Sequence, residues 1–303
     1  MPNVWTHILF GNRTAEEGGF KPAGQEKTAY QLGCQGPDPF FYHRFFPWQK
    51  DGAAVIGDRI HHKYCGSFLM DMIEDGMKTD ILTKAYIGGF VTHHILDRTA
   101  HPYINYRAGT EGNRHQKLEI IIDTLLMKRY RKIETYKTPV YKEIDLGPDL
   151  YPEIEELLAK LIEFYFPEEH SQLRSGYIND SYRDMIRALK VLYDPSGIKN
   201  RLLGKMIEPF SYQKDLPEGD FLNEKKKEWI HPAAEEETYT ASFEELMEHA
   251  EEEASRILKV IQLYWLGDQT LYPRLKELIG NISYDTGKSC EGSYENRIFD
   301  PIL

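Results

Sequence analysis

Cysteine is scarce in this sequence of 303 residues, which contains only Cys34, Cys65 and Cys290. The number is odd, the positions are far apart and none has CxxC spacing. This pattern argues against a disulfide framework and against cysteines as metal ligands. We therefore expect three reduced thiols, as is typical of a cytoplasmic protein.

Long apolar runs are also lacking. No stretch approaches the roughly 18–20 uninterrupted apolar residues of a membrane span. The N-terminus does not show the basic, apolar and small-residue order of a signal peptide. We expect neither a transmembrane segment nor a secretion signal.

Basic residues are fewer than acidic ones. The sequence contains 37 Lys and Arg against 48 Asp and Glu, which gives a net charge of −11. Such a balance argues against a protein that holds nucleic acid or an anionic membrane by a basic surface. The basic, tyrosine-rich stretch 128–142 could suggest nucleic-acid contact, but we expect a solvated helix end and loop there. A phosphate substrate is still allowed, because bound cations reverse the local charge.

Motifs of nucleophilic or phosphate-loop chemistry are missing as well. The sequence has no GxSxG elbow, no GxxxxGK loop, no internal repeat and no strand pattern of any length. A hydrophobic content of 41% and an aromatic content of 13% suffice for a real core. We predict an all-α fold with one domain over residues 1–303.

Helical patterns fill most of the chain, although residues 1–13 show no strong period. The clearest helix begins with a capping box at Ser242–Glu245, and the best candidate for a long loop is 211–237. Further helices are predicted at Gln25–Gly33, Gly57–Met77, Tyr151–Phe166, Tyr177–Tyr193, Gly197–Met206 and Pro273–Ile279.

One stretch, Gly88–Asp123, carries most of the chemistry. It contains His93, Asp97, His101, His115 and Glu119, which are four, four, fourteen and four positions apart. Residues four apart share a face of an α-helix. Imidazoles and carboxylates that converge from two helices are the ligands that zinc prefers. The alternative is an amphipathic helix pair whose polar side chains are capped or solvated; we favour the metal site.

The two helices of this stretch are expected to be separated by a turn. Pro102 disfavours helical geometry at His101, so the first helix should end about there. A loop with Gly109 and Gly112 then turns the chain back, and the second helix presents His115 and Glu119. His93 is preferred over His94 because it lies four residues before Asp97.

These residues resemble the zinc-dependent phospholipase C family, which is related to the zinc-dependent single-strand nucleases. The pattern GFxxHxxLDxxxHPY, followed by HxxxE, carries the resemblance. Segments similar to the family's other ligand segments occur in the same order, at MPNVWTHILFG, QLGCQGPDPFFYH and GDRIHHKYCGSF, and the likeness continues to 221–232 and 241–257. The resemblance implies an all-α fold and two or three zinc ions.

The resemblance also implies three further ligands: His7, Asp38 and His61. His7 alone could be a histidine buried between aromatic residues, and Asp38 could be a turn residue before an aromatic run. By the resemblance His7 binds zinc, and Asp38 binds zinc and is the candidate base. Adjacent side chains point about 100° apart on a helix, so His61 and His62 can hardly both face one metal, and the resemblance implies His61.

We expect Asp97 to bridge two ions, because it lies one helical turn from both His93 and His101. The expected ligand sets are Asp38, His61, His93 and Asp97 for one ion, His101, His115 and Glu119 for a second, and His7 with Asp97 for a third. The terminal amine is a further candidate ligand, although this chain starts with Met1-Pro2 rather than with the family's processed tryptophan.

The predicted function is zinc-dependent hydrolysis of a phosphodiester, phospholipase C-like, by a metal-activated water. A small phosphoester or a phospholipid is the expected substrate, and no stable nucleic-acid complex is expected. The alternatives are a nuclease-like phosphodiesterase and a non-catalytic metal-binding module on the same fold.

Overall fold

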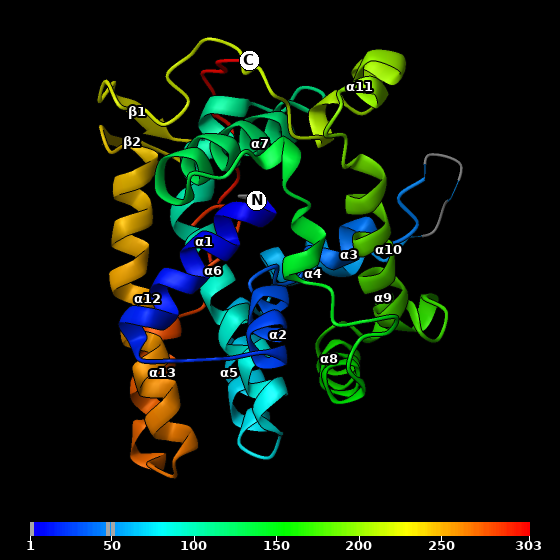
Figure 1. Ribbon diagram of the computed structural model, residues 1–303. Coiled ribbons are helices and arrows are strands. Elements are labelled where there is room, and N and C mark those ends of the chain that lie inside the picture. Colours follow the sequence, from blue (N-terminus) through cyan, green and yellow to red (C-terminus); the bar gives the residue numbers. More distant parts are fainter. Residues whose placement is uncertain (1–2, 47–48, 50–51) are drawn as a thin grey trace.

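A computed structural model describes residues 3–46, 49 and 52–303. These residues form an all-α fold with one small β-hairpin, as predicted (Figure 1). The helices are α1 (Val4–Gly18), α2 (Gln25–Gly33), α3 (Pro39–Tyr42), α4 (Ala54–His62), α5 (Cys65–Gly76), α6 (Ile81–Ala108), α7 (Arg114–Leu126), α8 (Pro152–Tyr165), α9 (Pro167–Gln172), α10 (Tyr177–Leu192), α11 (Ile198–Leu203), α12 (Phe243–Trp265) and α13 (Tyr272–Ile279). The hairpin consists of β1 (Trp229–His231) and β2 (Ala234–Tyr239).

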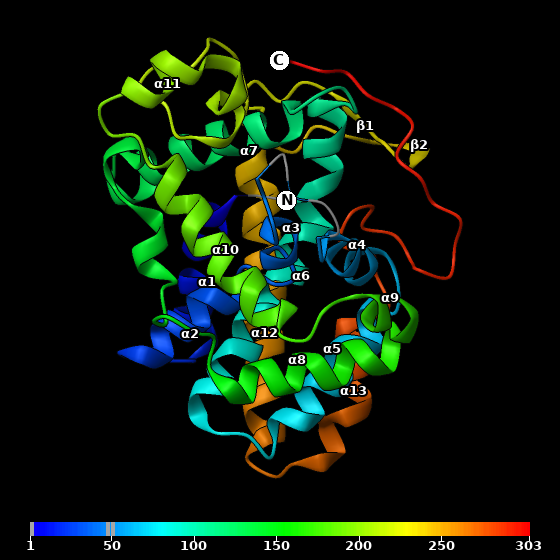
Figure 2. The same ribbon diagram turned by 90° about the vertical axis from the view of Figure 1, so that its right-hand side faces the viewer.

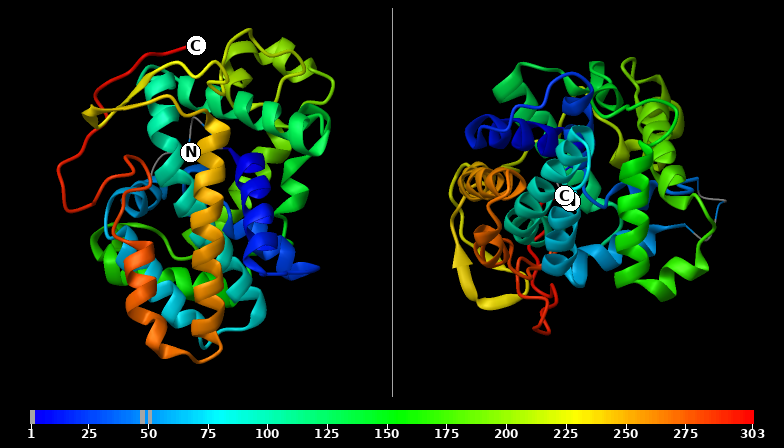
Figure 3. Two further views of the ribbon diagram at one scale, coloured as in Figure 1. Left: turned by 90° about the vertical axis from the view of Figure 1, so that its left-hand side faces the viewer. Right: turned by 90° about the horizontal axis from the view of Figure 1, so that it is seen from below.

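Helix α6 lies at the centre of the molecule. Helices α1, α2, α5, α7 and α12 all pack against it, and it is buried almost all around from Ala85 to Asp97. The structure is therefore built around the helix that carries three of the predicted ligands. Helices α12 and α13 lie together on one flank (Figure 3). Helices α8, α9 and α10 lie on the other flank and face the viewer in Figure 2.

Glycines allow α2 and α6 to approach closely. A Cβ at Gly33 would lie 2.0 Å from the carbonyl oxygen of Tyr86, and a Cβ at Gly89 would lie 2.1 Å from that of Tyr30. Gly33 was expected to end its helix as a C-terminal glycine. It is the last residue of α2, as predicted, but its role is this close contact, and the left-handed conformation (φ 49°) falls to Gly36.

The predicted end of a helix before Pro102 is wrong, because α6 continues to Ala108. A proline inside a helix removes one hydrogen bond and costs about 3 kcal/mol. Burial on the far side of Pro102 offsets that cost, since Tyr103 and Ile104 have no exposed surface. The last carbonyls of α6 are also satisfied, because Tyr106 and Arg107 accept hydrogen bonds from Asp300 and Ile302 of the C-terminal tail.

The single helix predicted for Gly57–Met77 is two helices, α4 and α5, with Tyr64 between them in the left-handed region (φ 56°). The carbonyl oxygen of His61, which a continuous helix would use internally, accepts hydrogen bonds from the Tyr284 N–H and the Ser283 hydroxyl. A distant segment has therefore replaced the local helical bond.

The expectation of no strand is also wrong, since β1 and β2 pair antiparallel within and after the predicted long loop. Trp229 and Tyr239 are cross-strand partners and their rings stack at 4.8 Å. The exposed glutamates of β2 hid this hairpin, because its outer face has no apolar alternation.

A helix near the N-terminus was not predicted from the sequence, whereas a helix in the C-terminal part of the chain was. Helix α1 escaped prediction because most of its first turns are buried on all sides, which leaves no 3.6-residue period. The helix after Ser242 is confirmed as α12, with both hydrogen bonds of its capping box present.

The proposed role of the terminal amine falls on Met1, which lies outside the described residues.

Two of the dispersed cysteines meet in the fold. The sulfurs of Cys65 and Cys290 lie 3.4 Å apart, and all three cysteines are free thiols. Within the described part of the chain, no helix is both long and apolar enough to span a membrane.

Candidate metal centre

The structure brings all eight predicted ligand residues into three adjoining groups. The potential ligand atoms of each group lie within 4.8 Å of one another. The groups are His7, His93 and Asp97; Asp38, His61 and His93; and His101, His115 and Glu119. They come from α1, the turn before α3, α4, α6 and α7, so five parts of the chain converge.

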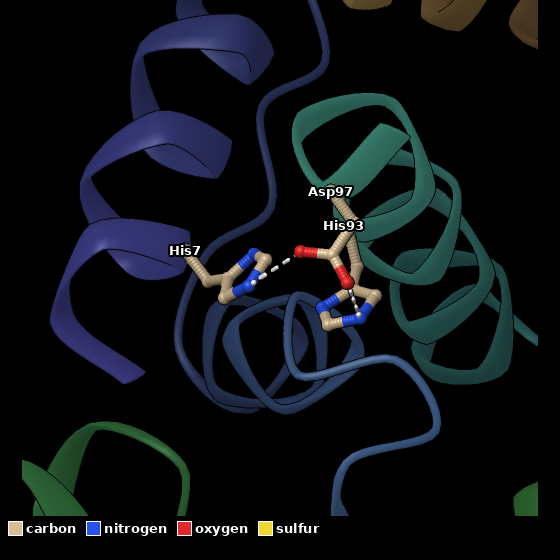
Figure 4. Close-up of side chains that lie close together, drawn as sticks. All are labelled: His7, His93 and Asp97. Carbon is tan, nitrogen blue, oxygen red and sulfur yellow. Dashed lines mark ion pairs between the residues drawn. The ribbon is translucent and has the colours of Figure 1, made fainter. Parts of the chain in front are cut away.

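Asp97 lies between imidazoles from three helices. Its Oδ1 is 3.3 Å from Nε2 of His7, and its Oδ2 is 3.0 Å from Nε2 of His93 (Figure 4). The same Oδ2 lies 3.6 Å from Nε2 of His61. Because the two oxygens face different histidines, this carboxylate has the placement that a bridging ligand needs.

Backbone carbonyls orient three of the histidines. Nδ1 of His61 lies 2.6 Å from the carbonyl oxygen of Gly57, Nδ1 of His93 lies 3.0 Å from that of Cys34, and Nδ1 of His101 lies 2.7 Å from that of Tyr284. A carbonyl only accepts, so in each neutral ring the proton sits on Nδ1. The lone pair of Nε2 is then free to bind a metal, an arrangement common around metal-binding histidines.

The inward-facing atoms have no hydrogen-bond partners among the residues that the structure describes. They are Nε2 of His7, His61, His93 and His101, Oδ1 of Asp38 and both carboxylate oxygens of Asp97. Buried polar atoms without partners are costly, and such a concentration needs an explanation. Imidazole nitrogens and carboxylate oxygens are ligands of zinc, so a zinc cluster fits the residues present.

Asp38 has its position because of the glycine turn before it. Gly36 (φ 49°) leaves room for His93, since a Cβ there would lie 2.3 Å from the ring. Asp38 Oδ1 lies 3.5 Å from Nε2 of His61 and 3.7 Å from Nε2 of His93. Asp38 precedes α3 as a turn residue, and its side chain faces the histidines instead of capping the helix.

The third group joins the ends of α6 and α7. Nε2 of His115 lies 2.7 Å from Oε1 of Glu119, one turn along α7. The His101 and His115 rings are 5.8 Å apart, and Nδ1 of His101 lies 3.8 Å from Asp97. The three groups therefore form one continuous cluster.

Burial sets the protonation of this cluster in the absence of a cation. It lowers the pKa of His7, and it lowers the pKa of His101 and His115 to about 3, which keeps these rings in the neutral form that binds metal. Burial also works against a charged His61, but Asp38 and Asp97 raise its pKa to about 9. Burial raises the pKa of Glu119 well above its usual value. A bound cation would compete with protons at His61 and Glu119.

The neighbouring histidines face elsewhere. His62 is exposed, and its Nε2 lies 3.6 Å from Asp285. His94 is buried, but its Nε2 lies 2.8 Å from the carbonyl oxygen of Ile282. In both histidine pairs the residue chosen from the sequence is the one that lies in the cluster.

A cavity of about 490 Å³ reaches the cluster at His115. Its other walls include Asn105 and Asp285 and, from the C-terminal tail, Tyr294 and Phe299. A larger cavity of about 650 Å³ between α5 and α8 contains none of the eight residues. We regard the smaller cavity as the entrance, because chemistry at the cluster needs access to it.

Comparison with known proteins agrees with this geometry. A sequence profile of the family described as zinc-dependent phospholipase C matches residues 6–193, which include all eight candidate ligands. The chain belongs to the zinc-dependent phospholipase C family. Neither the curated proteins nor the solved structures contained a match. Family membership and the buried clusters together support a zinc-dependent hydrolase.

Sequence reasoning missed Asp123, a buried residue that holds α1 in place. Its carboxylate accepts hydrogen bonds from the N–H groups of Trp5 and Thr6, from the Thr6 hydroxyl at 2.6 Å and from the Tyr212 hydroxyl at 2.6 Å. A carboxylate at a helix N-terminus is favourable, and here it fixes the turn that presents His7. The signal was available, because Asp123 continues the four-residue spacing of His115 and Glu119.

Tyr284 was also missed, and it lies beyond the part of the chain that the family profile matches. Its carbonyl orients His101, and its ring packs against those of His61, His93 and His94. No spacing rule in the sequence connects residue 284 with the ligand helices. This phospholipase C family member therefore completes the surroundings of its candidate metal centre with its C-terminal segment.

Proposed function

We propose that this protein is a zinc-dependent phosphodiester hydrolase with a phospholipase C-like activity. The observation that carries the proposal is the set of buried Nε2 and carboxylate atoms that face one another without hydrogen-bond partners among the described residues. Family membership supports the reaction class. The proposed ligand sets are those expected from the sequence, with two or three zinc ions.

Zinc bound at this centre would supply Lewis-acid chemistry, which lowers the pKa of water toward about 7 and stabilises charge on phosphoryl oxygens. The side chains have separate tasks. Asp97 would hold neighbouring ions at a fixed spacing, and the carbonyl contacts of His61, His93 and His101 keep their lone pairs directed inward. Asp38 is the proposed base, because this residue is 7% exposed whereas Asp97 is fully buried.

Access to the cluster is expected through the cavity beside His115, whose side chain is 24% exposed. The phosphodiester would reach the ligands from this side, while the remainder of the substrate contacts the tail residues Tyr294 and Phe299. A mixed wall of aromatic and polar groups suits a small phosphoester or the head-group region of a phospholipid.

A substrate panel tests the proposal. Zinc-loaded protein should hydrolyse bis(p-nitrophenyl) phosphate and release diacylglycerol from a phospholipid, and Asp97→Asn should do neither. Cleavage of a single-stranded oligonucleotide in place of the phospholipid would assign the protein to the nuclease-like class. Bound zinc without turnover of any of the three substrates would show a non-catalytic metal-binding protein.

A further inference from the structure

An apolar segment on the surface stands apart from the rest of the molecule. Helix α11 and the 3₁₀ turn after it, Gly204–Met206, expose Ile198, Leu202, Leu203 and Met206, with exposed fractions of 59%, 77%, 50% and 68%. We call these four residues the α11 patch. Ile198 and Leu202 are four residues apart and so share one face of the helix. Several large apolar side chains exposed within nine residues are unusual for a surface helix.

The polarity of α11 is reversed with respect to the usual surface helix, which buries its apolar side. Its polar residue Asn200 faces the protein, where its Nδ2 donates to Asp194 and its Oδ1 accepts from Ser211 and Gln213. The Nζ of Lys199 also turns inward and donates to two carbonyl oxygens at the end of α10. Polar anchoring holds the helix in place and leaves the apolar side chains outside.

The charge of this segment is also opposite to that of the chain. Residues 196–207 contain Lys199, Arg201 and Lys205 and no acidic residue, whereas the whole chain has a net charge of −11. The global deficit of positive charge argues against a basic surface, but it does not describe this segment. Lys199 turns inward, but Arg201 is exposed. An exposed basic side chain beside exposed apolar ones matches the interface of a membrane with anionic head groups.

Helix α11 lies at the same end of the molecule as α7, which carries two candidate ligands (Figures 1 and 2). The chain after the patch, Glu208–Phe210, packs against α7. Glu208 forms an ion pair of 2.8 Å with Lys117, which lies between His115 and Glu119 on α7. Residues two apart point about 200° apart on a helix, so this contact lies on the face of α7 away from His115 and Glu119. Insertion of the patch into a lipid layer would therefore bring α7, and with it this end of the molecule, toward the surface that holds the substrate.

We propose that the α11 patch is an interfacial binding site for a lipid surface with anionic head groups. The inference rests on the proposed phospholipase activity, which would give the surface binding its purpose. Binding itself needs no turnover, so the two can be tested separately. Apolar side chains supply the affinity, and Arg201 adds attraction that salt weakens.

Vesicle flotation tests this site. Zinc-loaded protein is mixed with vesicles of equal parts phosphatidylcholine and phosphatidylserine, and the fraction that floats is measured. We expect the wild type to float, and the double variant Leu202→Asp/Met206→Asp to bind at least roughly tenfold more weakly. Leu266→Asp is the matched control, since Leu266 is 84% exposed and directly follows α12, far from α11 in Figure 1. It should bind like the wild type.

Hydrolysis of soluble bis(p-nitrophenyl) phosphate, measured in parallel, separates this proposal from the proposed function. Equal turnover by all three proteins, with loss of flotation only in the double variant, supports the interfacial site. A wild type that does not float, or a double variant that floats equally well, overturns it. Dispersal of a wild-type dimer by Leu202→Asp/Met206→Asp, without vesicle binding by either protein, would assign the patch to self-association. Flotation without turnover would refute the hydrolase and leave the interfacial site supported.

Discussion

Asp97 has no exposed surface, and its two carboxylate oxygens face histidines on different helices. Burial works against its charge, but the neighbouring His101 and His93 hold the pKa of Asp97 well below its usual value. A carboxylate that stays ionised inside a set of imidazoles is suited to shared metal binding. Glu119, by contrast, is at one end of the cluster, in the group of His101 and His115.

Asp97→Asn should therefore cost more than Glu119→Gln. We expect Asp97→Asn to lose zinc from two positions and to lower phosphodiester hydrolysis by more than about 100-fold, since even neighbours of metal ligands account for 10–100-fold. Glu119→Gln should lose at most one ion. Elemental analysis and turnover of the two variants, side by side, check this. Equal zinc content and equal activity would remove the bridging role.

Asp123 acts on the site through the position of α1. Asn in its place keeps the shape but offers an N–H₂ group where only acceptors fit, opposite the donors of Trp5, Thr6 and Tyr212. We expect Asp123→Asn to lower the free energy of unfolding by about 2–3 kcal/mol. Zinc affinity at the His7 position should fall as well. Urea unfolding with a zinc titration measures both, and unchanged values in the two experiments would contradict a positioning role.

At the scale of elements, the contact between α2 and α6 positions the first ligands. It places the Cys34 carbonyl against His93, and it depends on the glycines at 33 and 89. Gly33→Ala would place a methyl group 2.0 Å from a backbone oxygen, so the helices must separate.

We expect Gly33→Ala to destabilise the protein by about 2–3 kcal/mol or more. Gly88→Ala is the matched control on α6, because its Cβ would come no closer than 3.3 Å to the Phe20 ring. Alanine is also favoured over glycine in a helix by about 1 kcal/mol, so this variant should change stability little. Thermal unfolding of both proteins decides the matter. Similar melting temperatures would show that the close contact does not limit the fold.

The elements also show which predictions could be made from the sequence. The four-residue spacing of His93, Asp97 and His101 was visible because it is local, and so was the capping box of α12. The break between α4 and α5 was not visible, because its cause is the hydrogen bonding of His61 to residues more than two hundred positions away. Helix α6 continues through Pro102 for a similar reason, because burial of the residues on both sides outweighs the local cost of a proline inside a helix.

The candidate site residues likewise differ in whether the sequence alone could reveal them. Side chains that repeat along one helix were found, and His7, Asp38 and His61 followed from the family resemblance and lie in the cluster. Tyr284 was not found, because it contributes mainly through its carbonyl oxygen, which every residue type possesses. Groups of this kind become visible only when the fold brings them to the site.

For the whole molecule, the metal centre joins segments from both ends of the chain. Helix α1 supplies His7, α6 and α7 supply five ligand candidates, and the C-terminal segment orients His101. The described apolar core forms one continuous cluster. The single domain and the cytoplasmic location stay predictions.

Removal of zinc should destabilise the whole protein, because it leaves buried carboxylates and imidazoles without partners. We expect a chelator to lower the melting temperature by about 5 °C or more and zinc to restore it. Differential scanning calorimetry measures the change. Magnesium, which prefers oxygen ligands, should not restore it. An unchanged melting temperature after complete chelation would contradict a metal centre at the core of the fold.

Zinc content per chain tests the central claim most directly. Elemental analysis of purified, zinc-loaded and dialysed protein should find at least two ions per chain. His61→Ala should lose at least one of them, whereas His62→Ala, which changes the adjacent exposed residue, should retain all. No bound zinc in the wild type, or the same zinc content in both variants, would contradict the assignment of this cluster as a zinc centre.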